Sequence, residues 1–122
     1  MFVTLLHNQL ATTMLYFMFV CGVWAVIGSF RGGISGSLAG ALVLGEGLIL
    51  LQGVLGIILY LTGHRPAQGL HFLYGVAAAV TLPGIYSYVK GKPSRQQALM
   101  LGIGALFIVG LAIRGIVTAT TR

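Results

Sequence analysis

One acidic side chain within an apolar stretch is the first candidate for chemistry in this sequence. Glu46 is the only Asp or Glu among 122 residues, and at 1.5 Å per helical residue it lies about 6 Å from the middle of its stretch. A charge there costs about 2.5–3.5 kcal/mol in a membrane, so Glu46 should face protein or water. A protonated Glu46 can donate to the Ala79 carbonyl, which Pro83 leaves without its helical partner. The alternatives are coupling to a proton or cation and contact with another subunit.

Two further polar residues, Gln52 and Arg114, interrupt the apolar stretches. Arg114 lies about 8 Å beyond the middle of the last stretch, on the side opposite to Glu46, so the two charges are offset by about 14 Å. We therefore expect no direct bridge between them. Arg114 should reach the outer headgroups or Gln52, whose depth lies between the two.

Three histidines, His7, His64 and His71, form the second candidate site, because all fall toward the same side as Arg114. They could hold an anionic lipid headgroup or the head of a quinone. Two of them could instead ligate a b-type haem, which requires two histidines that face each other at similar depth from different helices. His71 begins a stretch, whereas His64 lies in a loop and His7 lies far from the centre of the first stretch. The sequence thus favours polar interfacial histidines with no cofactor, and haem b or a quinone is the alternative.

Small residues form the third pattern, because several are spaced four apart in the second stretch. Such spacing lets helix backbones approach closely in membranes. We therefore predict that the second helix packs tightly against a neighbour. The predicted packing residues are Gly36, Gly40, Gly45, Gly53 and Gly56.

Motifs of an independent enzyme are not found. A single carboxylate side chain cannot supply a paired-carboxylate mechanism or an oxygen-ligand metal cage. The single cysteine, Cys21, allows neither an intrachain disulfide nor a cysteine-based metal site. The glycine-rich segments lack the Lys-Ser or Lys-Thr of a phosphate-binding loop. We expect no catalytic activity of its own and no metal site.

The elements that must position these residues are membrane helices. The chain is 57% hydrophobic and only 7% charged, whereas soluble domains carry about 25% charged residues. Four apolar stretches are each close to the roughly 20 residues that cross a bilayer. The prediction is an all-α integral membrane protein, a single domain whose four helices form an up-down-up-down bundle with short connections. The predicted spans are 11–30, 38–62, 70–89 and 98–119.

The distribution of basic residues predicts the orientation. Four Lys and Arg residues lie in the loops near 31–37 and 90–97, against Arg65 and Arg122 on the other side, with Arg114 just inside the membrane. Positively charged loops tend to remain cytoplasmic, so these two loops are predicted to be inside and both termini outside.

The function is predicted only indirectly. The leading interpretation is a small accessory or structural subunit of a larger electron-transfer or photosynthetic complex, with other membrane subunits and lipids as partners and no nucleic acid. The second is a small homo-oligomeric, proton-coupled transporter or channel that uses Glu46. Small multidrug exporters are similar in size, in number of spans and in having a membrane glutamate, but their glutamate lies in the first span. The third is a membrane anchor that binds haem b or a quinone through His71 with His7 or His64.

Overall fold

The chain folds into four helices. The structure, a computed structural model, describes residues 2–64 and 69–120. Its elements are α1 (Phe2–Ser29), α2 (Gly36–Leu61), α3 (Leu70–Val89) and α4 (Ser94–Thr120). Each of the four is long and apolar enough to cross a membrane. The prediction of an all-helical chain with four candidate spans is thereby confirmed.

Three helices begin earlier than the predicted spans. Helix α2 starts two residues earlier, at Gly36, whereas α1 starts at Phe2 instead of Ala11 and α4 at Ser94 instead of Ala98. The start of α4 directly follows Pro93, whose carbonyl accepts from the backbone N–H of Gln97 at 3.0 Å. Helices α1 and α4 thus continue into polar residues beyond the apolar stretch that defines a span.

The helix ends near the loops are set by short-range contacts. Ser35 caps α2, because its hydroxyl accepts from the backbone N–H of Leu38 at 3.1 Å. At the other end of α2, Gly63 adopts a φ of +92°, a left-handed conformation that glycine reaches without steric cost. This turn brings the N–H of His64 to the carbonyl of Leu59 at 2.8 Å, as in other glycine-terminated helices.

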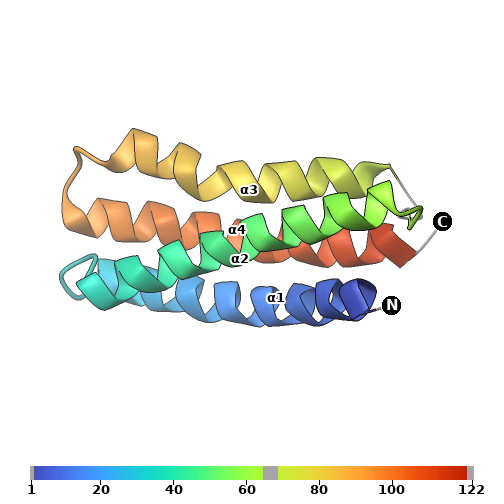
Figure 1. Cartoon of the computed structure of the whole chain (residues 1–122). Coiled ribbons are helices and arrows are strands. Elements are labelled where there is room, and N and C mark those ends of the chain that lie inside the picture. The colour runs from blue at the N-terminus through green and yellow to red at the C-terminus, as the bar shows by residue number, and fades with distance from the viewer. Residues whose placement is uncertain (1, 65–68, 121–122) are drawn as a thin grey trace.

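Each helix of the bundle contacts two neighbours, and α4 lies between α1 and α3. Helix α4 packs extensively against α1 and α3, and α2 packs mainly against α1. The contact between α2 and α3 is the smallest of the adjacent pairs. The connections that follow α1 and α3 lie together at one end of the bundle, called here the loop end (Figure 1). The start of α1 and the end of α4 lie at the opposite end. The core is apolar and draws on all four helices; its largest fully buried apolar side chains are Met18, Leu38, Ile108, Val89 and Cys21.

Glycines allow α1 and α4 to approach closely. A Cβ built on Gly102 would lie 2.9 Å from both the Cβ of Ala25 and the backbone nitrogen of Val26. A Cβ on Gly22 would lie 2.7 Å from the side chain of Leu106. The close approach of α1 and α4 therefore depends on one glycine from each helix.

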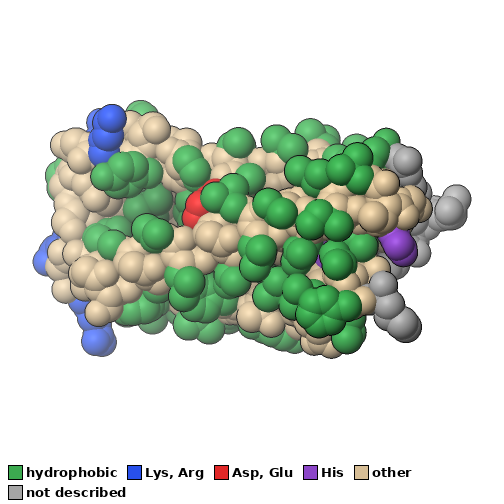
Figure 2. All heavy atoms as spheres, viewed as in Figure 1, with side chains coloured by type: hydrophobic (Ala, Val, Ile, Leu, Met, Phe, Trp, Pro, Cys, Tyr) green, Lys and Arg blue, Asp and Glu red, His purple; other side chains and the backbone are tan. Residues whose placement is uncertain are grey.

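The loop end is held together by a contact between its two connections. The backbone N–H of Ile34 donates to the Ser94 hydroxyl at 2.8 Å, and Gly33 packs directly against Ser94. Lys and Arg side chains gather at this end, and hydrophobic side chains cover the length of the bundle (Figure 2). The surface is thus apolar along the helices and basic at the loop end, which is the pattern of a candidate multi-pass membrane protein.

Candidate functional site: a histidine pair and an unpaired glutamate

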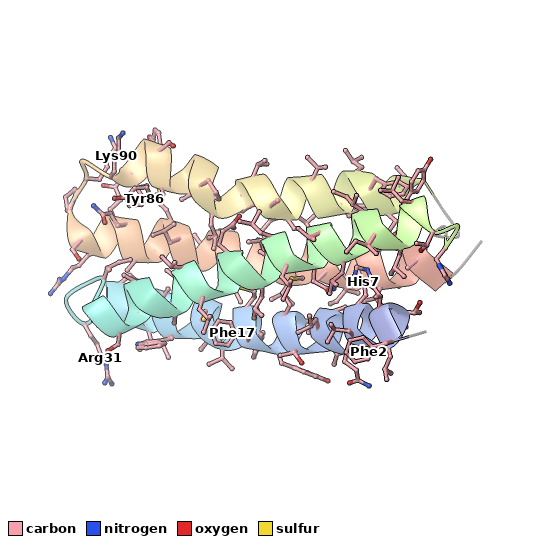
Figure 3. The ribbon with its side chains drawn as sticks, in the orientation of Figure 1. Phe2, His7, Phe17, Arg31, Tyr86 and Lys90 are labelled. Carbon is pink, nitrogen blue, oxygen red and sulfur yellow. The ribbon has the colours of Figure 1, made fainter. Side chains whose placement is uncertain are left out.

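Two of the three histidines meet inside the bundle. The ring centroids of His7, on α1, and His71, on α3, lie 6.3 Å apart, with their planes at 68°. His7 points from α1 toward the other helices (Figure 3). The two residues come from helices that are not neighbours in sequence, and they lie near the end of the bundle opposite the loops.

The backbone of α4 fixes the orientation of His71. Its Nδ1 lies 2.7 Å from the carbonyl oxygen of Gly115. Because a carbonyl only accepts hydrogen bonds, this contact assigns a proton to Nδ1, which leaves Nε2 of the neutral ring with a free lone pair. A backbone carbonyl that holds one ring nitrogen is also how proteins orient histidines that bind metals through the other nitrogen. His71 is therefore arranged as a potential ligand.

His7 differs from His71, because its Nδ1 is buried without a hydrogen-bond partner. The ring packs against a glycine of α2: a Cβ on Gly56 would lie 3.6 Å from His7 Cε1. This distance is an ordinary van der Waals contact, so α2 packs against the His7 ring at Gly56.

Four buried side-chain atoms among the described residues lack partners, and they belong to residues of α1 and α2. Besides His7 Nδ1, they are Thr4 Oγ1, Gln52 Oε1 and Glu46 Oε1. Thr4 precedes His7 by about one turn of α1, and Gln52 precedes Gly56 by about one turn of α2. Unpaired buried polar atoms are rare in folded proteins and often mark sites that a ligand, water or partner completes.

An apolar groove lies beside the histidine pair, where α2 and α3 meet. It is lined by Ile57, Tyr60 and Phe72. The Phe72 ring lies edge-on to Tyr60 at 5.3 Å and to His71 at 6.1 Å, both between centroids. Because α2 and α3 share the smallest helix contact, this groove offers the readiest lateral approach to the pair.

His64 does not join the other two histidines. It follows α2, where its Nδ1 lies 3.2 Å from the hydroxyl of Thr62, and its side chain is exposed. The predicted collar of three histidines is therefore reduced to a pair, and the members of that pair come from the first and third helices.

Glu46 does not form the hydrogen bond to Ala79 that was one of the alternatives for it, because its buried Oε1 has no partner among residues 2–64 and 69–120. No ion pair joins Glu46 to Arg114 in these residues, and none was expected from their depths. Arg114 instead places its Cζ 5.9 Å from the centre of the Tyr74 ring, a cation–π contact. The basic residues Arg65 and Arg122 lie outside the described residues.

The predicted packing glycines divide into two groups. Gly45 packs against the sulfur of Met18, and Gly56 against His7, so both lie at the interface of α1 and α2. Gly36, Gly40 and Gly53 have no heavy atom of the described chain within 4 Å of an added Cβ. Only the first group serves packing within the chain.

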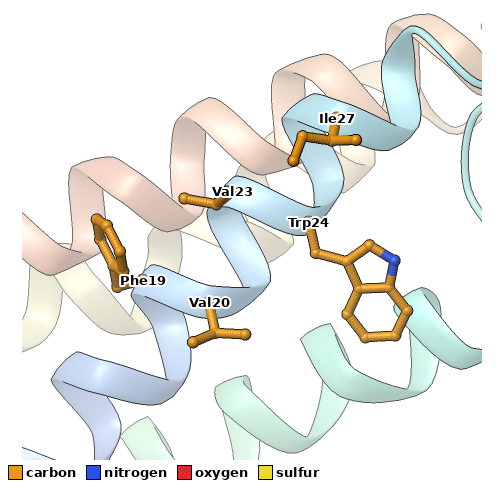
Figure 4. Close-up of a pocket in the computed structure, with 5 residues that line it drawn as sticks. All are labelled: Phe19, Val20, Val23, Trp24 and Ile27. Atoms are coloured by element: carbon orange, nitrogen blue, oxygen red, sulfur yellow. The ribbon is translucent and has the colours of Figure 1, made fainter.

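A second groove lies on the outer surface of α1 and is built from that helix alone (Figure 4). It contains no polar side chain apart from the indole of Trp24, and its five lining residues are Phe19, Val20, Val23, Trp24 and Ile27. Such a surface fits contact with lipid tails.

Sequence reasoning missed two parts of the site. The carbonyl of Gly115 was not anticipated, since any residue type supplies a carbonyl and no sequence signal marks this one. Thr4 was missed because it lies before the predicted first span.

Comparison with protein-family models, with curated proteins and with solved structures finds no match to this chain. The function must therefore be argued from its own residues.

Proposed function

We propose that the chain is a four-span membrane subunit of an electron-transfer complex and binds haem b between His7 and His71. In this proposal the helices cross the membrane in an up-down-up-down arrangement. The loop end is cytoplasmic and both termini are outside, following the distribution of basic residues. The observation that carries the proposal is the distance of 6.3 Å between the two imidazole rings.

The separation of the rings suits a metal ion held between them. With metal–nitrogen bonds of about 2.0 Å, two imidazoles on opposite sides of one ion have centroids about 6 Å apart. Two histidines alone are too few for a bare ion, which in proteins usually takes about four ligands. Among residues 2–64 and 69–120, no group of three or more His, Cys, Asp or Glu could complete such a set.

Haem needs only two ligands from the protein, because its macrocycle supplies four nitrogens to the iron. When bound, it supplies reversible one-electron chemistry. His71 would bind the iron through Nε2, with Gly115 fixing its ring, and His7 would be the second ligand. The groove of Ile57, Tyr60 and Phe72 would cover an apolar edge of the macrocycle. A quinone head is supported less well, because the Nδ1 hydrogen of His71 is already donated to Gly115 and is not free to bind a quinone carbonyl.

Absorption spectroscopy of single variants tests the proposal. We expect the purified protein, supplied with haem, to show the Soret band of a six-coordinate haem with two histidine ligands. His71→Ala and His7→Ala should each remove this spectrum, and His64→Ala, the matched control, should retain it. Circular dichroism verifies that each variant is helical. A wild-type protein that binds no haem, or a spectrum unchanged in both variants, contradicts the proposal.

A proton-coupled transporter is the second candidate, and the buried, unpaired Oε1 of Glu46 favours it. A carboxyl group without a fixed partner can exchange a proton as helices move. In vesicles that contain the purified protein, Glu46→Gln should abolish proton-linked flux and leave the assembly intact. Flux that persists at the wild-type rate would exclude this role for Glu46.

A further inference from the structure

Arg114 carries its charge on α4 without an anionic partner among the described residues. The only carboxylate side chain, Glu46, belongs to α2 and is offset from Arg114 by about 14 Å along the bundle. Gln52, the other partner considered for Arg114, leaves its Oε1 without a hydrogen bond. A charged side chain on a membrane helix needs a partner or the polar headgroups. The anion that pairs with Arg114 should therefore come from outside the chain.

The depth of Arg114 is fixed by its neighbours on α3. The next residue, Gly115, accepts from Nδ1 of His71, the second residue of α3, at 2.7 Å. The Arg114 Cζ lies 5.9 Å from the centre of the Tyr74 ring. Helical side chains lean toward the start of their helix, so this ring points to the same end of α3. Because α3 has about the length of a 30 Å hydrocarbon layer, the guanidinium lies near the border of the headgroups opposite the loop end.

An apolar stripe of α4 runs from Arg114 toward the loop end. Arg114 is exposed, Phe107 and Ile103 are 57% and 55% exposed, and Gly110 has no heavy atom within 4 Å of an added Cβ. Spacings of three and four residues place these side chains on one face of the helix. The opposite face of α4 is buried in the core and includes Ala105, Ile108 and Ala112. The stripe therefore faces outward and leaves room for an extended hydrocarbon chain.

A basic group at the border of the hydrocarbon and an apolar stripe below it fit an anionic phospholipid. The phosphate of such a lipid lies at this border, and a guanidinium binds phosphate through two parallel hydrogen bonds. The acyl chain of the lipid would cover the stripe. Inorganic phosphate has no such chain. A carboxylate of another protein would have to be removed from water at this depth, which costs free energy that a lipid phosphate does not spend.

We propose that Arg114 binds the phosphate of an anionic phospholipid in the leaflet opposite the loop end, with an acyl chain along Gly110, Phe107 and Ile103. The Tyr74 ring holds the guanidinium on this side of α4 by its cation–π contact. The lipid site does not depend on haem binding, since the stripe faces outward and the histidine pair lies inside the bundle.

Quenching of a single tryptophan tests the site. Trp24 is the only tryptophan, so Phe107→Trp in a Trp24→Phe background places the sole indole beside the proposed acyl chain. The vesicles combine brominated phosphatidylglycerol, whose bromines quench an indole on contact, with unbrominated phosphatidylcholine in varied proportions. The quenching profile gives the binding of phosphatidylglycerol relative to phosphatidylcholine. We expect a preference of about fivefold for phosphatidylglycerol, the effect of one basic residue at an anionic headgroup.

Variants of two arginines in this reporter protein separate the site from the net charge. Arg114→Gln should abolish the preference, and Arg114→Lys, which keeps the charge, should retain most of it. Arg95→Gln changes the net charge equally at the loop end, and this matched control should keep the preference. Circular dichroism verifies that each variant is helical. No preference in the unsubstituted reporter, an unchanged preference in Arg114→Gln, or an equal loss in Arg95→Gln overturns the proposal.

Native mass spectrometry gives a second measurement that needs no reporter. After release from nanodiscs that contain both lipids, the wild type should carry one phosphatidylglycerol molecule more than Arg114→Gln. Excess inorganic phosphate should not remove this lipid. Equal lipid content in the two proteins overturns the proposal, and loss of the lipid to inorganic phosphate overturns it by assigning the site to a free anion.

Discussion

At the scale of single residues, the two histidines of the pair differ in how firmly each is held. The Nδ1 of His71 has a backbone acceptor in Gly115 at 2.7 Å, whereas the Nδ1 of His7 is buried without one. A ring fixed by a carbonyl keeps its free nitrogen in one direction. His71 is therefore the preorganised member of the pair, and His7 is the member that must adjust when a ligand binds.

Glu46 is a residue whose removal should stabilise the isolated chain. A buried oxygen without a partner costs about 1–3 kcal/mol, and methionine fills a similar volume without a polar group. We expect Glu46→Met to raise the free energy of unfolding by about 1 kcal/mol, measured by denaturant titration in detergent at dilutions where the chain is monomeric. Glu46→Gln, which keeps a polar group, is the control and should change little. A less stable Met variant would show that Glu46 contributes a favourable contact within the monomer.

The sequence identifies the residues of the site better than it identifies their pairing. His7, His71, Glu46 and Gln52 stand out because polar residues are rare in apolar stretches. Which histidines meet depends on how each helix is rotated about its axis, and a turn of one residue moves a side chain by about 100° around the helix. His64 follows the end of α2, where Gly63 turns the chain and the N–H of His64 donates to the carbonyl of Leu59. The partner of His71 could not be predicted, since it is a backbone carbonyl.

At the scale of the helices, the contact of α1 with α4 determines how compactly the bundle packs. Gly22 and Gly102 replace side chains where the two helices are closest. Close packing of this kind is the main source of attraction between helices in a membrane, where hydrophobic burial contributes little. Sequence reasoning expected tight packing on the second helix instead, because the spacing of small residues is densest there. The spacing alone does not show which small residues face a neighbour: Gly36, Gly40 and Gly53 have open space around them.

Substitutions at two glycines of α4 should therefore have opposite effects. At Gly102, a methyl group would lie 2.9 Å from the backbone nitrogen of Val26. Gly102→Ala should destabilise the bundle by about 1–3 kcal/mol, because backbone atoms cannot move aside cheaply. Gly110→Ala should be neutral or stabilising by up to about 1 kcal/mol, since alanine favours the helix. Thermal unfolding followed by circular dichroism distinguishes them, and equal effects would contradict the close contact at Gly102.

At the scale of the whole molecule, the helices of the bundle differ in how much of their surface is covered by neighbouring helices. Helix α4 is enclosed between α1 and α3, while α3 leaves most of its surface uncovered and barely contacts α2. Hydropathy predicted the number of candidate spans, since it depends on composition along the chain. It could not predict this arrangement around the axis, because four apolar helices with short connections can pack in several orders. The groove of Ile57, Tyr60 and Phe72, where α2 and α3 share few contacts, lies beside the histidine pair.

The unequal lengths of the helices also make the two ends of the bundle differ. Helix α1, with 28 residues, is about 42 Å long, and α3, with 20 residues, is about 30 Å long. The additional length of α1 lies at its start, which carries Thr4, His7, Asn8 and Gln9. If α3 crosses a hydrocarbon layer of about 30 Å, this polar start of α1 would extend past the layer into the headgroup region on the side opposite the loop end. One face of the membrane would then meet a helix with polar side chains, and the other would meet two short basic connections.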